Sequence, residues 1–188
     1  MSRRFLQQVL LLPGPDQAPT PVDVLLDGGT IGAIGVEASQ QAAALGMAPE
    51  PASGWLLAPA LVDPHSLLED PWNGVAETQA SLQRSALAAG YGTVALLPQA
   101  QCWRDCPGAL QLSIADSGLS VHLWGALSRG GAGQELAPHA DQLAAGAIGI
   151  AEGPSTPPLP LLERALALGE MGEAPVLVTA RDPALSRQ

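Results

Sequence analysis

Two cysteines are the first residues whose type and spacing could do chemistry. Cys102 and Cys106 are separated by three residues in an expected loop and could form a redox pair or half of a zinc site. A structural zinc site needs a second pair of Cys or His ligands at similar spacing, and the sequence has no such pair. We therefore interpret both cysteines as incidental to function. So few thiols indicate a cytoplasmic protein rather than a secreted disulfide scaffold.

The three histidines are the other candidates for metal or proton chemistry. His122 lies in an expected strand, where we expect its ring to be packed inside the protein. His139 lies in an expected helix, away from the apolar stripe of that helix, and we expect a solvated surface position. His65 follows the strand predicted after residue 55, in a turn without glycine. Such a turn does not place backbone amides on a pyrophosphate, so the sequence disfavours a dinucleotide site.

The charge balance excludes several functional classes. The chain of 188 residues carries 18 acidic and 8 basic side chains, for a net charge of −10, and all the basic residues are arginines. Without lysine there is no P-loop, no Schiff-base chemistry and no carboxylated-lysine metal bridge. The negative charge makes nucleic acid an unexpected partner, and the apolar runs are too short for a membrane span.

The positions of these residues depend on an N-terminal β segment followed by alternating strands and helices. Residues 5–12 and 22–36 are predicted to form short strands with a hairpin turn at Asp27-Gly28-Gly29. Residues 37–54 are rich in Ala, Gln and Pro and are interpreted as a linker. We therefore expect two domains, residues 1–54 (a small β-rich segment with its linker) and residues 55–188.

The second domain alternates apolar runs with helical patterns. The runs are typical of strands buried on both faces of a parallel sheet, and each of the four helical patterns ends at a glycine. The sequence predicts an α/β fold with about four βα units and a fifth strand. A flavodoxin-like sheet remains an alternative, with helices on both faces. Strands are expected at Leu56–Val62, Thr93–Leu97, Val121–Leu127, Ala147–Ile150 and Val176–Val178, and helices at Glu77–Ala89, Ala109–Ser117, Glu135–Ala145 and Leu159–Met171.

Several segments in register along the chain carry a resemblance to a known family. They are Val24–Gly35, Leu57–His65, Glu77-Thr78, Ala89–Pro98 and Ala145–Ile150. Together they resemble the first half of dihydroorotase and related cyclic amidohydrolases. The resemblance implies the N-terminal part of a (β/α)₈ barrel preceded by a small β segment. It also implies hydrolysis of a cyclic amide by zinc-activated water, as in pyrimidine biosynthesis, with the ligands at the carboxyl ends of the strands.

The residues at the implied ligand positions differ from the family pattern. The second histidine of the His-x-His motif that begins at His65 is Leu67, and the substrate-gripping arginine is Glu69. The histidine after the fifth strand is Thr179. Two relic metal positions remain, His65 and Glu152, of which His65 is expected to be held by hydrogen bonds. Since a catalytic zinc needs at least three protein ligands, we expect no cofactor, or zinc if any activity remains.

Two further positions match the family only approximately. The resemblance places Gln99 at the position of a substrate-binding asparagine after the second strand, and Arg129 at that of a lysine after the third. The sequence ends at Gln188, before the strands that carry the family's remaining ligands.

These differences favour a catalytically inactive dihydroorotase-like protein. Inactive homologues of this family serve as partners of aspartate transcarbamoylase, so the resemblance implies a similar protein partner, or self-association. The alternatives are a residual metal-dependent amidohydrolase that acts on a cyclic amide, a decayed gene product, and the flavodoxin-like binding domain.

An incomplete barrel predicts an uncovered apolar face with unpaired edges at Leu56–Val62 and Val176–Val178. Because large apolar patches are rare on soluble monomers, we expect the isolated chain to self-associate, bind a hydrophobic dye or require a partner. Analytical ultracentrifugation with a dye titration tests this expectation. A compact, dye-negative monomer that unfolds cooperatively would contradict it.

Overall fold

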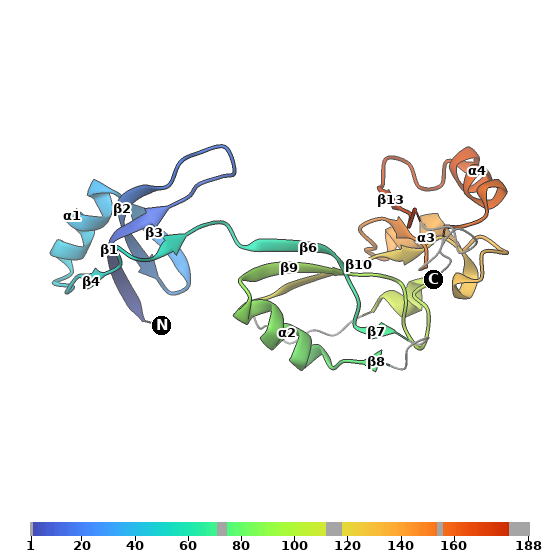
Figure 1. Cartoon of the computed structure of the whole chain (residues 1–188), viewed down its shortest axis with the longest axis horizontal. Coiled ribbons are helices and arrows are strands. Elements are labelled where there is room, and N and C mark those ends of the chain that lie inside the picture. Colours follow the sequence, from blue (N-terminus) through green and yellow to red (C-terminus); the bar gives the residue numbers. More distant parts are fainter. Residues whose placement is uncertain (1, 71–74, 112–117, 154–155, 181–188) are drawn as a thin grey trace, which may run out of the picture. The chain divides into compact units, whose positions relative to one another are not determined.

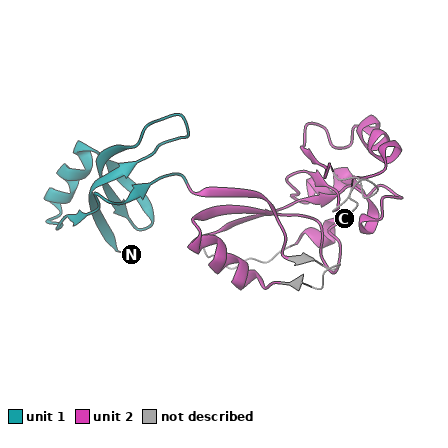
Figure 2. Cartoon of the chain, viewed as in Figure 1, with its two compact units in different colours: residues 1–59 teal, residues 60–188 magenta. Residues whose placement is uncertain are grey.

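A computed structural model describes residues 2–70, 75–111, 118–153 and 156–180. The chain divides into two units, Met1–Pro59 and Ala60–Gln188 (Figure 2). The division follows Pro59, whereas the sequence predicts a boundary after residue 54. In the part that the structure describes, no helix has the length and apolar character needed to cross a membrane.

The first unit is a small sheet with one helix on it. Strand β1 pairs antiparallel with β2 and parallel with β4 and β5, and β2 pairs with β3. Positive φ angles of 61° at Gly28 and 92° at Gly29 close the β2–β3 hairpin as the sequence predicts. The elements are β1 (Arg3–Leu11), β2 (Thr20–Asp27), β3 (Thr30–Ile34), α1 (Val36–Ala44), β4 (Glu50–Pro51) and β5 (Leu56–Leu57).

The linker prediction for residues 37–54 is wrong, because this segment contains α1 and β4. Ala38 and Ala42, one helical turn apart, are fully buried against Phe5 and Leu25 of the sheet. Small side chains allow a close approach of the helix, but they leave no stripe of large apolar residues that periodicity could detect. The Oγ of Ser39 in α1 also donates to the Asp23 Oδ2 of β2 at 2.6 Å.

The second unit alternates strands and helices along the chain (Figure 1). The strands are β6 (Leu61–Ser66), β7 (Glu69–Asp70), β8 (Val75–Ala76), β9 (Tyr91–Leu96), β10 (Ser120–Leu123), β11 (Gly125–Ala126), β12 (Ile150–Ala151) and β13 (Val176–Leu177). The helices are α2 (Gln79–Ala88), α3 (His139–Ala144) and α4 (Leu159–Leu168), with the 3₁₀ turns η1 (Pro107–Leu110) and η2 (Arg129–Gly131).

The parallel strands of this unit pair in chain order. β9 lies between β6 and β10, and β12 lies between β11 and β13. Only Trp124 separates β10 from β11, so one extended segment pairs with β9 through its first half and with β12 through its second half. This stagger between neighbouring strands is the geometry of a barrel wall.

Helices α2 and α4 of the second unit pack on one face of its parallel strands. Leu82 and Ala86 of α2 contact residues of β9 and β10 such as Val94 and Val121, and Ala165 of α4 packs with Ile150 of β12. Alternate residues point to the other face, where Ala95, Leu97, Trp124 and Ala151 form a separate buried cluster. A doubly wound sheet would carry helices on both faces, so this arrangement does not support the flavodoxin-like alternative.

Several element boundaries differ from the sequence prediction. The strand expected at Leu56–Val62 is interrupted by Ala58–Ala60, so that β5 belongs to the first unit and β6 to the second. The helix expected at Glu135–Ala145 begins only at His139, after Pro138. Residues 107–110 form the turn η1 where a helix was expected from Ala109, and residues 112–117 of that expected helix lie outside the described residues.

One buried amide holds α3 to the sheet. The Gln142 Oε1 accepts from the Ala126 backbone N–H at 2.7 Å, and the Gln142 Nε2 donates to the Ala126 carbonyl at 3.1 Å. Gln142 is fully buried. The Gln142 side chain therefore forms hydrogen bonds with both the N–H and the C=O of Ala126 in β11.

Replacing this amide should destabilise the protein. Gln142→Ala leaves the Ala126 C=O buried without its Gln142 partner and leaves the Ala126 N–H with only the Arg104 carbonyl as acceptor, for which we expect a loss of about 2 kcal/mol in the free energy of unfolding. Gln40→Ala, at an exposed position of α1, is the matched control and should change it by less than about 0.5 kcal/mol. Urea unfolding of both variants measures the difference, and equal effects would contradict this role for Gln142.

Candidate functional site

The polar side chains of interest follow the ends of neighbouring parallel strands, at the carboxyl edge of the sheet. Gln99 follows β9, Ser128 follows β11, Glu152 follows β12 and Thr179 follows β13. In (β/α) barrels this edge carries the active site, because loops from several strands converge there. The carboxyl edge of the sheet therefore holds side chains that the sequence predicts as site residues.

Glu152 is buried, with 6% of its surface exposed. Its Oε1 accepts from the Ser128 Oγ at 2.7 Å, and its Oε2 accepts from the Ser128 backbone N–H at 3.1 Å. Burial raises the pKa of Glu152 above its ordinary value, although the hydrogen bonds from Ser128 and the nearby His139 oppose the shift. Both carboxylate oxygens thus link β12 to β11.

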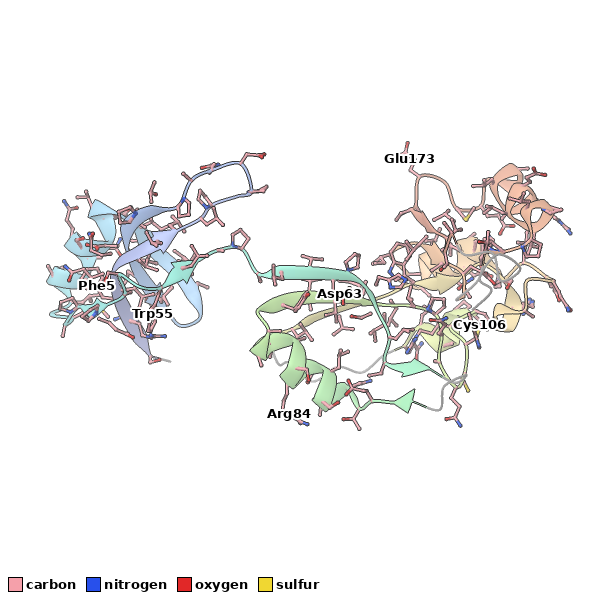
Figure 3. All side chains as sticks on the ribbon, in the orientation of Figure 1. Phe5, Trp55, Asp63, Arg84, Cys106 and Glu173 are labelled. Atoms are coloured by element: carbon pink, nitrogen blue, oxygen red, sulfur yellow. The ribbon has the colours of Figure 1, made fainter. Side chains whose placement is uncertain are left out.

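His65 is exposed near the end of β6. Its backbone N–H donates to the Asp63 Oδ1 at 2.9 Å, and the Ser66 Oγ donates to the Asp63 Oδ2 at 2.6 Å. Asp63, labelled in Figure 3, therefore organises the local turn through the backbone. The imidazole extends toward solvent, with Leu67 also exposed two residues later.

No group of three or more His, Cys, Asp or Glu side chains that could hold a metal ion occurs among the described residues. Among the described residues, therefore, no third donor lies close enough to His65 and Glu152, the predicted relic ligands, to complete a metal site with them. A catalytic zinc needs at least three protein ligands, and the donors in the described part of the chain do not fit such an ion.

Gln99 is buried at 4% exposure, and its Oε1 has no hydrogen-bond partner among the described residues. A buried acceptor without a partner is costly and is a natural place for a ligand donor or a water molecule. The structure thus places the predicted substrate-binding residue inside the carboxyl edge with a free acceptor.

Arg104 is a residue that sequence reasoning missed. It is buried at 5% exposure, and its Nη1 donates to the Leu97 carbonyl at 2.7 Å. Its own carbonyl accepts from the Ala126 N–H at 3.0 Å, so this loop residue ties β9 to β11. Its place between Cys102 and Cys106 was the available signal, since an arginine in an apolar loop segment needs buried acceptors.

The expected environments of two histidines are wrong. His139 is fully buried rather than solvated, and its Nε2 lies 2.8 Å from the Leu127 carbonyl oxygen. Its position at the first turn of the shorter helix α3 turns the ring toward the sheet. His122 is exposed rather than packed, because it alternates with Val121 and Leu123 and so points away from the helices that cover them.

Thr179 and Arg129 make local contacts. The Thr179 Oγ1 donates to the Gly153 carbonyl at 3.2 Å, which ties the segment after β13 to the end of β12. The Arg129 Nε lies 3.2 Å from the Glu135 Oε1 in an exposed ion pair. Neither side chain is directed by these contacts toward the acceptor of Gln99 or the carboxylate of Glu152.

Comparisons with known proteins match these features to one family, although no family model matches the chain. A probable dihydroorotase-like protein of Synechocystis sp. is 29% identical over 182 residues, which cover 84% of this chain and 41% of that protein. A dihydroorotase of Syntrophobacter fumaroxidans is 31% identical over 137 residues, or 70% of this chain and 31% of that protein. Over more than two thirds of its length, the chain is thus similar to cyclic amidohydrolases of the dihydroorotase type. This confirms the resemblance stated from the sequence.

The likeness to solved structures identifies the fold. A dihydroorotase crystal structure matches 97% of this chain and 52% of that chain at 14% identity, with a TM-score of 0.62. An L-hydantoinase from Arthrobacter aurescens matches 78% of this chain and 32% of that chain at 18% identity, with a TM-score of 0.51. The predicted partial amidohydrolase barrel is therefore confirmed, and the chain spans less than half the length of the curated relatives named above.

The raised pKa of Glu152 predicts how stability depends on pH. The folded state holds the Glu152 proton more tightly than the unfolded state, so the ionised carboxylate contributes an increasing destabilisation as pH rises from the unfolded pKa through the folded pKa. Glu152→Gln removes this titration. The stability of the natural protein relative to Glu152→Gln should therefore fall as pH rises through that range.

Urea unfolding from about pH 4 to about pH 8 measures this difference. Glu173→Gln, at an exposed position after α4, reports the effect of removing a surface carboxylate. A relative stability that instead rose with pH would show that the hydrogen bonds from Ser128 outweigh burial.

Proposed function

We propose that the chain is a dihydroorotase-like protein that binds a partner rather than hydrolysing a cyclic amide. The observation that carries the proposal is the state of Glu152. Both of its oxygens are used by Ser128, so the remaining acidic ligand of the family pattern acts as a link between strand ends. Each hydrogen bond occupies one lone pair of its oxygen, so a metal at Glu152 would have to share the carboxylate with the link to Ser128.

The other donor positions support the proposal. Leu67 and Thr179 stand where the family resemblance implies imidazoles; an alkyl group cannot ligate zinc, and a neutral hydroxyl is a poor ligand. Glu69 stands where an arginine would grip a substrate carboxylate, and it would repel such an anion. In this proposal the chain requires no cofactor.

A binding role also accords with the exposed edge of the second unit. On β6, Leu61 and Val62 are 53% and 63% exposed, and within the described residues β6 pairs only with β9 in its sheet. An unpaired edge with apolar side chains is a template for an added strand. The proposed partner is a protein that supplies such a strand, either an aspartate transcarbamoylase-like protein or a second copy of this chain.

A cytoplasmic location is part of the same proposal. Cys102 and Cys106 are both free thiols, although they are close in sequence. Free thiols persist in reducing compartments.

One observation favours a second candidate, residual metal-dependent hydrolysis of a cyclic amide. The unpaired Oε1 of Gln99 could accept a hydrogen bond from the ring N–H of such a substrate. Zinc would have to be held by His65, Glu152 and donors outside the described residues.

The activity test compares the chain with an authentic dihydroorotase under the same conditions. We expect no hydrolysis of dihydroorotate, and no ring closure in the reverse direction, above a blank that contains zinc alone, because the donor set is incomplete. Turnover that depends on Gln99 and Glu152 would overturn the proposal in favour of the second candidate.

A metal titration tests the cause of the expected inactivity. Zinc should bind no more tightly than about micromolar, because at most two ligands remain. The double variant Leu67→His with Thr179→His should bind zinc at least about tenfold more tightly, while Leu87→His on α2, away from the carboxyl edge, should not. Chelator competition measures all three proteins, and stoichiometric zinc in the natural protein as isolated would contradict the proposal.

A further inference from the structure

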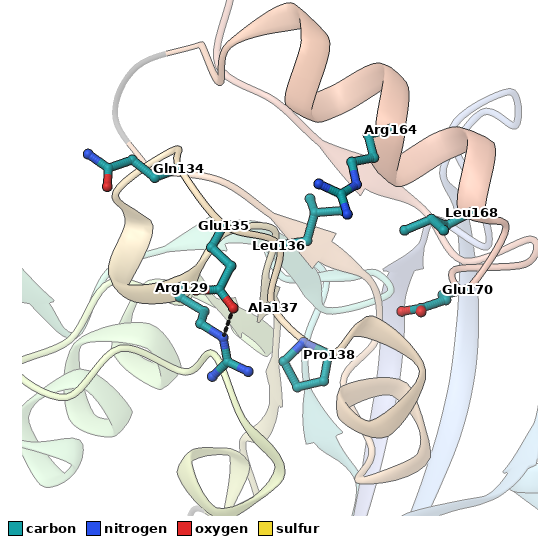
Figure 4. Close-up of a pocket in the computed structure, with 9 residues that line it drawn as sticks. All are labelled: Arg129, Gln134, Glu135, Leu136, Ala137, Pro138, Arg164, Leu168 and Glu170. Atoms are coloured by element: carbon teal, nitrogen blue, oxygen red, sulfur yellow. Dashed lines mark hydrogen bonds and ion pairs between the residues drawn. The ribbon is translucent and has the colours of Figure 1, made fainter.

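A cavity of about 350 Å³ lies between the loop of residues 129–138 and helix α4 (Figure 4). It does not include His65, Gln99 or Glu152 among its lining residues. Its size is at the lower end of the range for small-molecule sites. The cavity therefore suits one small ligand, and neither the family resemblance nor the proposed binding role gives it a function.

The loop that forms one wall is held by backbone contacts. The Arg129 N–H donates to the Glu135 carbonyl at 2.9 Å, and Ser128 and Leu136 form an antiparallel bridge. The Ser128 Oγ accepts from the Gly133 N–H at 2.9 Å. Because Ser128 is itself fixed by Glu152, this wall is organised before any ligand arrives.

The opposite wall comes from α4 and the turn that ends it. Arg164 and Leu168 lie one turn apart on α4, and the left-handed φ of 68° at Gly169 changes the chain direction before Glu170. In Figure 4 the Arg164 side chain extends from α4 toward Leu136, and Glu170 lies beside Leu168. A cationic and an anionic group thus reach the same cavity from the end of one helix.

The charges of the lining are balanced but not all paired. Arg129 is engaged by Glu135 at 3.2 Å. Arg164 and Glu170 line the cavity, and neither side chain makes an ion pair or hydrogen bond with another described residue. One free guanidinium and one free carboxylate therefore face the same space, next to the apolar side chains of Leu136 and Leu168.

We propose that this cavity binds a small zwitterion, an α-amino acid with an apolar side chain. The ligand carboxylate would pair with the Arg164 guanidinium, its ammonium group with the Glu170 carboxylate, and its side chain would contact Leu136 and Leu168. A simple anion fits less well, because the chain carries a net charge of −10 and Glu170 would repel it. The two free charges of opposite sign define the ligand class.

L-Leucine is the probe, titrated into the full chain by calorimetry and by NMR of the labelled protein. We expect saturable binding, and binding about tenfold weaker for Arg164→Gln and for Glu170→Gln, since each removes one charged partner. Arg84→Gln on α2 and Glu163→Gln on α4, outside the cavity lining, are the matched controls and should bind L-leucine as the natural protein does.

Two analogues of the probe test the requirement for both charges. 4-Methylpentanoate lacks the ammonium group and 3-methylbutylamine lacks the carboxylate, and we expect each to bind about tenfold more weakly than L-leucine. Equal binding of either analogue would overturn the zwitterion proposal in favour of a simple anion or cation site. No saturable binding of L-leucine, or unchanged binding by both cavity variants, would also overturn it.

Discussion

The second unit depends on a single extended segment that changes its pairing partner at Trp124. The residues before Trp124 (β10) pair with β9, and the residues after it (β11) pair with β12. The Trp124 N–H donates to the Leu96 carbonyl at 2.9 Å, and its Nε1 donates to the Pro64 carbonyl of β6, also at 2.9 Å. One residue thus joins the two ladders and also contacts the first strand. Without it, β6, β9 and β10 would form one three-stranded sheet and β11, β12 and β13 another, with no residue to join them.

The stagger at Trp124 also sets which face receives the helices. Because side chains alternate along a strand, Val121 and Leu123 point toward the helices while His122 and Trp124 point away from them. The indole then fills the face opposite the helices beside Ala95 and Ala151. In a (β/α) barrel that face becomes the interior. The packing that supports the family assignment therefore follows from one pairing register.

The sequence predicted the large features of the fold because they rest on strong periodic signals. Parallel strands in chain order, the hairpin at Gly28 and Gly29, and the helices near residues 79–88 and 159–168 follow from apolar runs and glycine positions. Helix α1 was missed because alanine carries little hydrophobic signal even when Ala38 and Ala42 are buried. The sequence predicts a packed His122 and a solvated His139, and the structure has the reverse. A shift of one residue in a strand, or of a few residues in the start of a helix, is enough to turn a side chain to the opposite face.

The candidate site was predictable only as a set of positions. The sequence identified Glu152 and Gln99 at strand ends, where parallel topology must bring them to one edge. It could not indicate that Ser128, two residues after β11, would bind both oxygens of Glu152. Nor could it indicate that Arg104 would be buried with the Leu97 carbonyl as a partner. Such contacts depend on loop conformations that no periodicity specifies.

The contact between α3 and the sheet has a consequence for how this sequence can diverge. A Cβ added at Gly125 would lie 2.5 Å from the Gln142 Oε1 and 3.1 Å from the Ile150 Cδ1. Because Gly125 has no side chain, the Gln142 amide can lie close to its Cα and reach the Ala126 backbone. A side chain at position 125 would force the Gln142 amide to shift away from the Ala126 backbone, so the effects of substitutions at the two positions on stability will not add. Sequence change at position 125 is therefore coupled to change at position 142, although glycine has no chemistry of its own.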